Sequence, residues 1–294
     1  MVIINLKGGL GNQLFEYASA LAIATARNQK LAFDVQSFMS DSYGRQYAFE
    51  PFKINYRLYA QEDINSFLKL TLQERILNYL KPRESKRYYS LRDQEFDPSI
   101  LNATVKNQYL NGYFANPSYF EDIRPELLQQ VSLKENLQTN AFKNKVKWIK
   151  QNKFISVHIR RADYISDKGA NQLFETLRRD YYDRCIAHFE ADASCSKKFL
   201  FFSDDIEWVK SEFQDLDHCY FIEEPELYKD YYDLMLMASC EHNIIANSTF
   251  SWWGAWLNTN PEKTVLAPQK WYRNEHYQKN YQTFTFIPKT WLLK

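Results

Sequence analysis

The chain has 294 residues, of which 45% are hydrophobic and 25% charged, so it can bury one large core or two medium ones, and its length favours two domains. Lys plus Arg number 37 and Asp plus Glu number 36, which gives a formal net charge of +1. This balance excludes a global electrostatic field that would attract nucleic acid or an acidic membrane, so any anion-binding site must be local.

The chain shows no signal for export or for a membrane span. It carries no basic N-terminal region followed by a cleavage signal, and no apolar run of about 18 residues. We therefore expect a cytoplasmic protein, with peripheral contact at the inner membrane face left open.

The cysteines Cys185, Cys195, Cys219 and Cys240 form no C-x-x-C pair and no zinc-like spacing. We expect reduced, structural thiols and no metal site built on them.

The N-terminal residues predict a βαβ unit. Residues 2–6 are typical of a buried strand, residues 7–12 of a Gly-rich turn, residues 14–25 of an amphipathic helix and residues 31–35 of a second strand. The turn partly matches a dinucleotide fingerprint, because Asp34 stands where a ribose ligand would. The match is weak, since Leu14 occupies the third glycine position.

The middle of the chain is less regular. Residues 36–90 read as an insertion that contains a helix over residues 64–80, ending before Pro82 and a charged run at 81–87. A strand is predicted at 109–114, and a basic, weakly amphipathic segment at 141–153. We place the domain boundary there, with a first domain of residues 1–150 and a second of residues 151–294.

The second half predicts an α/β domain. Strand-like runs at 154–159, 199–202, 220–222, 243–246 and 264–267 alternate with helix-like segments. Such alternation is typical of a parallel sheet with helices on both faces. Polar clusters at 158–163, 203–205 and 247–251 each follow a predicted strand. Ligands bind at the carboxyl ends of such strands, so we expect the binding site at that edge.

The first polar cluster reads His158-Ile159-Arg160-Arg161-Ala162-Asp163. Two adjacent arginines after a buried strand cannot both enter one apolar core, so at least one can present its planar charged fork to a phosphate. Asp163 could orient that fork. The alternative is an Arg–Asp ion pair that ties a loop to a helix, and His158 alone is typical of a hydrogen-bonded core histidine.

The other two clusters each have a capping alternative. Ser203-Asp204-Asp205 can cap the following helix, or one carboxylate can accept hydrogen bonds from the N–H groups of guanine. Residues 247–251 can cap a helix, or supply hydroxyls and free N–H groups for a metal-free phosphate site. We expect the tryptophans that follow, Trp252, Trp253 and Trp256, to be packed.

Other functions compete with a transferase. The sequence Asp215-Leu216-Asp217 matches the D-x-D of metal-dependent glycosyltransferases, but its polar surroundings favour a solvated loop. A nucleotide-dependent oxidoreductase would explain Gly9, Gly11 and Asp34, and a glycan-binding protein would explain the many aromatic residues. Neither requires two arginines and two aspartates on one sheet edge.

These clusters resemble the motifs of the bacterial α1,2-fucosyltransferases of glycosyltransferase family 11, which share H-x-R-R-x-D with the α1,6- and protein O-fucosyltransferases. The matching segments are residues 8–18, 158–163, 202–205 and 247–254, in the family's order and over nearly the whole chain. Ala162 stands where the family often has Gly, and Leu14 and Glu16 replace its usual Met and Gln.

The resemblance implies a GT-B architecture, with two Rossmann-like domains facing a cleft. The C-terminal domain would bind GDP-fucose, and the acceptor would enter from the N-terminal side. The implied reaction is an inverting transfer of L-fucose from GDP-β-L-fucose to the 2-hydroxyl of a terminal galactose. The partners are thus GDP-fucose and a galactose-terminated oligosaccharide, and neither a metal nor another cofactor is required.

Site residues follow from the resemblance together with the clusters. We expect Arg160 to stabilise the leaving GDP, with Asp163 and Asn12 as candidates for the group that handles the acceptor proton. The predicted substrate-binding residues are Gly9, Gly11, Asn12, Gln13, His158, Arg160, Arg161, Ser203, Asp204, Asp205, Asn247, Ser248, Thr249 and Ser251. The irregular segment 36–90 is expected to select the acceptor.

Overall fold

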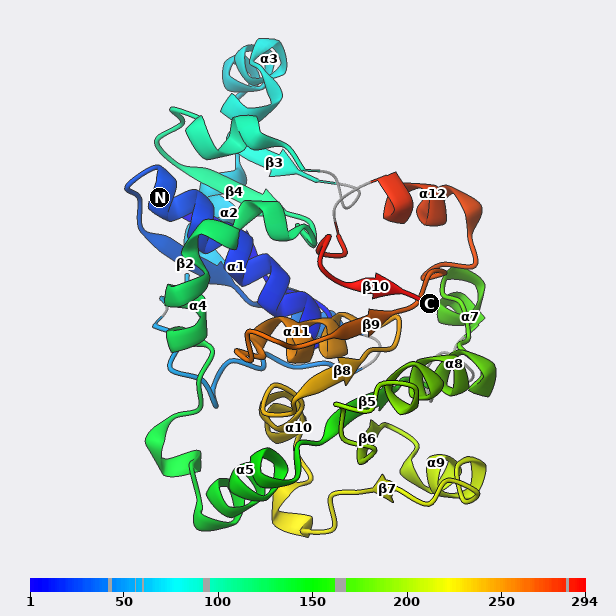
Figure 1. The fold of residues 1–294 in the computed structure, drawn as a ribbon. Helices are drawn as coiled ribbons and strands as arrows, with labels where there is room; N and C mark the ends of the chain where they lie inside the picture. Colours follow the sequence, from blue (N-terminus) through cyan, green and yellow to red (C-terminus); the bar gives the residue numbers. More distant parts are fainter. Residues whose placement is uncertain (42–43, 56, 60, 92–95, 162–167, 284–285) are drawn as a thin grey trace. The chain divides into compact units, whose positions relative to one another are not determined.

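A computed structural model describes residues 1–41, 44–55, 57–59, 61–91, 96–161, 168–283 and 286–294 (Figure 1). The chain divides into two compact units. Unit 1 comprises Met1–Leu133 and Thr283–Phe286, and unit 2 comprises Lys134–Gln282 and Ile287–Lys294. The sequence-based boundary at residue 150 therefore falls inside unit 2, within helix α5 (Asn140–Asn152). Helix α5 belongs there because its Phe142 ring stacks on Tyr232 of helix α10 (Asp230–Met237), with ring centres 5.2 Å apart.

Unit 1 contains a parallel sheet with strand order β2-β1-β4-β3. The strands are β1 (Val2–Asn5), β2 (Leu31–Asp34), β3 (Tyr88–Ser90) and β4 (Gln108–Asn111). Helix α1 (Leu10–Ala26) connects β1 to β2, which confirms the predicted βαβ unit. Strand β4 is shorter than predicted because Gly112, with φ of 146°, leaves the extended conformation.

The helix predicted over residues 64–80 is two helices, α2 (Gln61–Leu68) and α3 (Leu72–Leu80). The break is caused by Thr71, whose hydroxyl accepts the N–H of Glu74 while the Glu74 carboxylate accepts the N–H of Thr71. Such a capping box starts a new helix. Unit 1 also contains η1 (Gln36–Ser40), η2 (Arg83–Ser85), η3 (Pro98–Asn102), η4 (Pro117–Tyr119), η5 (Glu121–Ile123) and α4 (Arg124–Gln130).

Unit 2 contains a parallel sheet with strand order β10-β9-β8-β5-β6-β7. The strands are β5 (Ile155–Ile159), β6 (Phe199–Ser203), β7 (Cys219–Tyr220), β8 (His242–Ile244), β9 (Val265–Ala267) and β10 (Leu292–Leu293). All but β10 were predicted within a few residues. The helices besides α5 and α10 among the described residues are η6 (Glu135–Leu137), α7 (Lys168–Leu173), α8 (Arg179–Glu190), α9 (Ile206–Glu212), η7 (Pro225–Leu227), α11 (Thr249–Leu257) and α12 (Glu275–Thr283).

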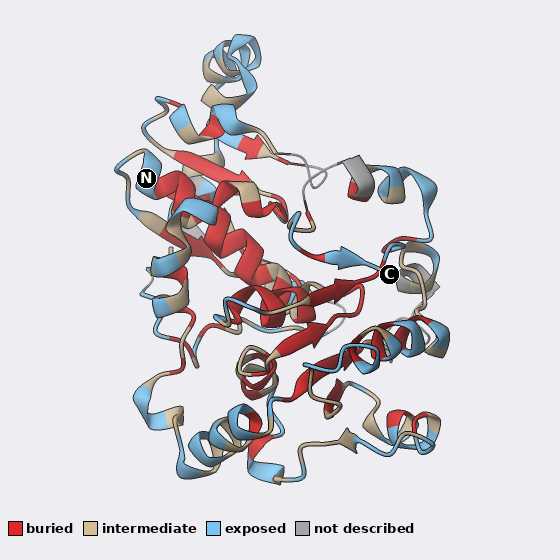
Figure 2. Cartoon of the chain, in the orientation of Figure 1, coloured by how far each residue is buried: buried red, intermediate tan, exposed pale blue. Residues whose placement is uncertain are grey.

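Both faces of the central strands of the unit 2 sheet are buried, because apolar side chains occupy successive positions there. In β6, Phe199 and Phe201 pack with α8 on one face, whereas Leu200 and Phe202 pack with α10 on the other. Figure 2 shows the resulting buried layer along β5. This burial fixes the register, so each strand's carboxyl end is held in place.

Two further expectations concern side chains of unit 2. Trp252 and Trp253 have no exposed surface and Trp256 is 4% exposed, so the predicted packing of the tryptophans is confirmed. The cysteines are all free thiols, as predicted. Among the described residues, no helix combines the length and the apolar character needed to cross a bilayer.

Candidate functional site

The described residues of the three polar clusters of unit 2 lie on one edge of its sheet. Strand β5 is hydrogen-bonded to β8 on one side and to β6 on the other, and all three run parallel. Ile159 pairs with Ser203, so the loop after β5 and the loop after β6 begin at the same level. The prediction that these clusters share the carboxyl edge is confirmed.

The carboxylate of Asp204 holds the arginine loop. Its Oδ2 atom lies 3.1 Å from Nη1 of Arg160, and its Oδ1 accepts the backbone N–H of Arg161 at 3.0 Å. The Arg160 side chain is 31% exposed, so solvent still reaches the guanidinium. A guanidinium carries five N–H donors in a rigid plane. A carboxylate that binds one edge of this plane therefore fixes the direction in which the remaining donors point. Asp204 thus orients Arg160 at the sheet edge.

Arg161 is held in a different way, by helix α9. Its guanidinium carbon lies 4.0 Å from the centre of the Trp208 ring, and its Nε atom lies 3.3 Å from Oδ2 of Asp205. Stacking and an ion pair together keep this side chain over α9. Trp208 was not predicted as part of the site. The sequence could have indicated Trp208, because it lies in the first helical turn after Ser203-Asp204-Asp205.

His158 is buried at the end of β5. The side chain is 4% exposed, and its Nδ1 atom has no hydrogen-bond partner among the described residues. Burial lowers the pKa of His158 to about 3, and the neighbouring charge of Arg160 acts in the same direction. The imidazole is therefore neutral in the folded protein, and the Phe250 ring lies 5.6 Å from it, centre to centre. Ala162 and Asp163 lie outside the described residues.

Ser203 and Asp205 cap helix α9. The Ser203 hydroxyl accepts the N–H of Asp205 at 3.0 Å, and Oδ1 of Asp205 accepts the N–H of Trp208 at 3.4 Å. The capping interpretation of this cluster is therefore confirmed. Since both aspartates also pair with arginines, guanine recognition by either carboxylate stays a prediction.

The cluster after β8 opens helix α11. The hydroxyl of Ser248 accepts the N–H of Phe250 at 3.3 Å, which makes Ser248 the N-cap. Ser251 is 1% exposed and donates to backbone oxygens of Ala246 and Ser248. Thr249 is half-buried at the first position of the helix. The positive end of the α11 dipole therefore lies on the same sheet edge as Arg160.

Asn247 has a structural role in this loop. Its amide donates to the backbone oxygens of Glu175 and Trp271 at 2.6 and 2.9 Å, and the residue is 1% exposed. The amide thereby ties the segments before α8 and after β9 to the end of β8. These bonds use both N–H groups of the amide, so a substrate could reach this side chain only through its Oδ1 atom.

In unit 1, the Gly-rich turn leads into helix α1 as predicted. Gly8 has φ of +73°, Gly9 is the N-cap of α1, and buried Gly11 lies in its first turn. A Cβ on Gly8 would lie 2.7 Å from Nδ2 of Asn12, so the missing side chain leaves room for this half-buried asparagine. Gln13 is fully buried and bonds the backbone of Gly8, Gln46 and Ala48, which is a structural role.

The carboxyl edge of the unit 1 sheet carries a polar cluster that the sequence analysis missed. Asn5 donates to Asn111 at 3.1 Å and accepts from the hydroxyl of Ser37 at 2.7 Å. The ammonium of Lys7 lies 3.3 Å from Oδ1 of Asn111 and 4.9 Å from the ring centre of Tyr113, which is 46% exposed. The sequence could have indicated this cluster, because Asn5 and Asn111 are the last residues of neighbouring strands.

Two weaker motifs have structural explanations. Asp215 of the D-x-D sequence binds Arg179 through both carboxylate oxygens, at 2.6 and 2.7 Å, and is 60% exposed. Asp34 accepts the hydroxyl of Tyr109 at 2.6 Å and the N–H of Gln36 at 2.9 Å, so it is occupied within unit 1. Within the described ranges, no group of His, Cys, Asp and Glu side chains is arranged to hold a metal.

Comparison with protein families identifies one match over nearly the full length. The family described as "Glycosyl transferase family 11" matches residues 1–291. The O-antigen biosynthesis glycosyltransferase WbnK of Escherichia coli is 33% identical over 93% of this chain and 96% of its own. An alpha-1,2-colitosyltransferase of Escherichia coli is 29% identical over 99% of this chain and 98% of its own.

A mammalian relative and a solved structure extend the comparison. The galactoside 2-alpha-L-fucosyltransferase Sec1 of Mus musculus is 26% identical over 91% of this chain and 67% of its own. The NodZ alpha-1,6-fucosyltransferase structure, co-crystallised with GDP, has a TM-score of 0.51 and 12% identity, covering 86% of this chain and 91% of that one. This likeness confirms the predicted α/β fold of the GT-B type.

Proposed function

The chain belongs to glycosyl transferase family 11 and is a glycosyltransferase, and we propose that it moves L-fucose from GDP-β-L-fucose to the 2-hydroxyl of a terminal galactose. The linkage and the acceptor class in this proposal match the names of the colitosyltransferase and Sec1 relatives. The observation that carries the nucleotide part is the orientation of Arg160 by Asp204 at the carboxyl edge of the unit 2 sheet.

We place the pyrophosphate of the donor at this edge, between Arg160 and the N-terminus of α11. The partly exposed guanidinium can donate two parallel hydrogen bonds to a phosphate, and the helix N-terminus adds its positive dipole and backbone N–H groups. Arg161 stacks on Trp208 and Asp205 caps α9, so we assign both residues to holding the loop in shape. His158, as a neutral buried ring, supports the end of β5.

In the proposed reaction, the bond between the anomeric carbon of fucose and the β-phosphate oxygen of GDP breaks. The acceptor oxygen O2 forms the new bond from the opposite face, which converts the β linkage to an α linkage. Negative charge develops on the departing GDP, and Arg160 stabilises it without a metal ion. The anomeric carbon gains oxocarbenium character, so the acceptor hydroxyl loses its proton late. Asp163 is the candidate for accepting that proton, and Asn12, whose amide is a poor base, is the candidate for orienting the hydroxyl.

We assign the acceptor to unit 1. Asn5, Asn111 and Ser37 offer amide and hydroxyl groups that suit a sugar's hydroxyls, and Tyr113 offers an exposed ring for stacking. Ser37 comes from the irregular segment 36–90 that is expected to select the acceptor. The free thiols fit a reducing compartment, so a cytoplasmic location is part of this proposal.

The direct test is an assay with GDP-fucose and a panel of galactose-terminated acceptors, with the product linkage determined by NMR. Formation of an α1,2-fucosyl product that persists in excess EDTA supports the proposal. If activity disappears in EDTA and returns with Mn²⁺, the metal-independent part is wrong. Calorimetry with GDP, NAD and free sugars separates a transferase from an oxidoreductase and from a lectin. Micromolar binding of GDP without binding of NAD is expected.

A second donor is supported by one observation. The relative that covers 99% of this chain is an alpha-1,2-colitosyltransferase, so a colitosyl donor is the alternative to a fucosyl donor. The two proposals share the linkage and differ in the transferred sugar. Competition between the two donors in one reaction mixture decides between them, because the ratio of products reports the ratio of the two kcat/KM values.

A further inference from the structure

Helix α3 turns its apolar side chains toward solvent. None of its nine residues is buried. The large apolar residues Leu72, Ile76, Leu77, Tyr79 and Leu80 are 75%, 57%, 60%, 81% and 74% exposed. Figure 2 shows α3 in the exposed and intermediate colours along its whole length. Leu72, Ile76 and Leu80 recur at the spacing of one helix face, so they form a continuous apolar stripe.

The polar side of α3 is the side that contacts its own unit. Glu74 lies 3.6 Å from Nη2 of Arg87, and the amide oxygen of Asn78 accepts the backbone N–H of Arg87 at 3.2 Å. A surface helix of a globular protein normally does the reverse and buries its apolar stripe. The orientation of α3 therefore leaves an apolar surface that the rest of unit 1 does not cover.

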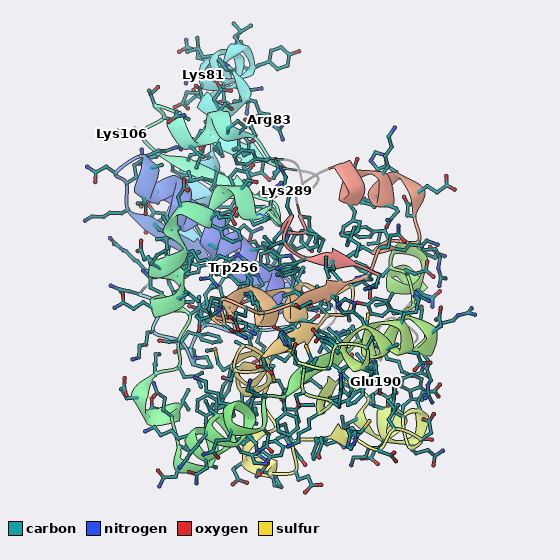
Figure 3. The ribbon with its side chains drawn as sticks, in the orientation of Figure 1. Lys81, Arg83, Lys106, Glu190, Trp256 and Lys289 are labelled. Atoms are coloured by element: carbon teal, nitrogen blue, oxygen red, sulfur yellow. The ribbon has the colours of Figure 1, made fainter. Side chains whose placement is uncertain are left out.

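The segment that contains this stripe is rich in basic residues. Residues 69–87 contain six basic residues, Lys69, Arg75, Lys81, Arg83, Lys86 and Arg87, but only two acidic ones, Glu74 and Glu84, in a chain whose net charge is +1. Figure 3 labels Lys81 and Arg83 beside α3, and both are exposed. The Lys86 ammonium lies 5.9 Å from the centre of the Tyr79 ring, so a cation and an amphipathic aromatic lie together at the margin of the stripe.

We propose that α3 and the segment that follows it form a docking surface for a membrane rich in anionic lipids. An interfacial helix inserts an apolar face below the lipid headgroups while its basic flank binds the anionic headgroups. The pairing of an exposed apolar stripe with a local excess of positive charge fits that surface. A symmetric dimer through the same face fits less well, because it would bring two positively charged segments together in an apolar contact. The proposal is independent of the reaction assigned above.

The test is co-sedimentation of the full chain with vesicles of phosphatidylglycerol and phosphatidylcholine, compared with phosphatidylcholine alone. Binding to the anionic vesicles that weakens at high salt is expected. The double variant Ile76→Asp, Leu80→Asp should reduce the partition coefficient at least 100-fold. The variant Lys81→Glu, Lys86→Glu should reduce it at least 25-fold, since each basic residue contributes about fivefold.

Two matched controls keep the test specific. Lys147→Glu, Lys150→Glu makes the same charge change on exposed positions of α5, and Tyr228→Asp replaces a side chain that is 57% exposed in unit 2. Both should bind vesicles like the parent protein, and every variant should bind GDP normally if it is folded, since the donor is assigned to unit 2. Equal loss of binding in the α5 variant would overturn the proposal. So would concentration-dependent dimerisation that Ile76→Asp, Leu80→Asp abolishes without any binding to vesicles.

Discussion

The carboxylate of Asp204 lies 3.1 Å from Nη1 of Arg160 and also accepts the backbone N–H of Arg161. This bridge between the ends of two neighbouring strands predicts that Asp204 acts on catalysis through Arg160. Replacement Asp204→Asn should lower kcat about 10- to 100-fold, because a neutral amide loses the charge that directs the guanidinium. Steady-state kinetics measure this effect. In Asp205→Asn the loss of kcat should be smaller, since Asp205 pairs with Arg161 and caps α9.

Arg160 itself should carry the larger effect. Removal of its guanidinium in Arg160→Ala is expected to lower kcat about 10²- to 10³-fold, the scale found when a preorganised charge-stabilising donor is lost. Arg160→Lys should recover only part of this, because an ammonium cannot form the planar two-point contact. The exposed Arg184 of α8, which pairs with Asp180, provides the matched control Arg184→Ala. Near-normal turnover by Arg160→Ala would refute the role assigned to it.

Gly8 and Gly9 allow a matched test of the turn before α1. Gly8 has φ of +73°, and a Cβ there would lie 2.7 Å from Nδ2 of Asn12, whereas a Cβ on Gly9 would meet nothing within 4 Å. Gly8→Ala should lower the free energy of unfolding by about 2 kcal/mol or more, since the left-handed conformation alone costs about 1–2 kcal/mol. Gly9→Ala should cost less than about 1 kcal/mol. Urea unfolding of both variants measures the difference, and equal losses would contradict the explanation.

The sequence predicted the long buried strands because they combine apolar residues with enough length to show a pattern. Strands β3 and β10 were missed because they contain three and two residues. The split between α2 and α3 was present in the sequence as the capping box of Thr71 and Glu74, but the apolar period continues past it. Apolar residues at this helical spacing normally indicate a buried helix face, but in α3 the apolar face is exposed.

Sequence reasoning predicted the sheet edge on which the polar clusters lie, but not the partner of each side chain. The shared sheet edge follows from strand order, which the alternation of elements predicts. The partner of each side chain depends on which loops meet there. Asp204 and Asp205 are adjacent and chemically identical, yet one holds Arg160 and the other caps α9. The cap formed by Asp205 is a local contact, but the pairing of Asp204 with Arg160 depends on the loop after β5 and has no local signal.

His158 predicts a pH-dependent loss of stability on the acidic side. Burial and the charge of Arg160 lower its pKa to about 3, whereas the unfolded chain binds a proton near pH 6.5. Below about pH 6.5 the unfolded state binds more protons, so stability falls as pH falls, by up to about 1.4 kcal/mol per pH unit for this group. The free energy of unfolding of the parent should therefore fall toward that of His158→Gln as the pH is lowered to 5. If the exposed His276→Gln variant converges in the same way, the assignment to His158 is wrong.

Glu16 predicts the opposite dependence. It is fully buried in α1, its Oε2 accepts the N–H of Lys7 at 2.9 Å, and its Oε1 has no hydrogen-bond partner among the described residues. Burial raises the pKa of Glu16 well above its usual value, although the Lys7 N–H and ammonium oppose this.

The folded protein therefore keeps a proton on Glu16 that the unfolded chain loses above about pH 4.5, and the stability contributed by this group declines as pH rises. Glu16→Gln removes this titration. Its unfolding free energy, measured relative to the parent, should increase from pH 5 to pH 8 by up to about 1.4 kcal/mol per unit. A difference that stays constant across this range would show that Glu16 is already ionised in the fold. The Lys7 contacts would then outweigh its burial.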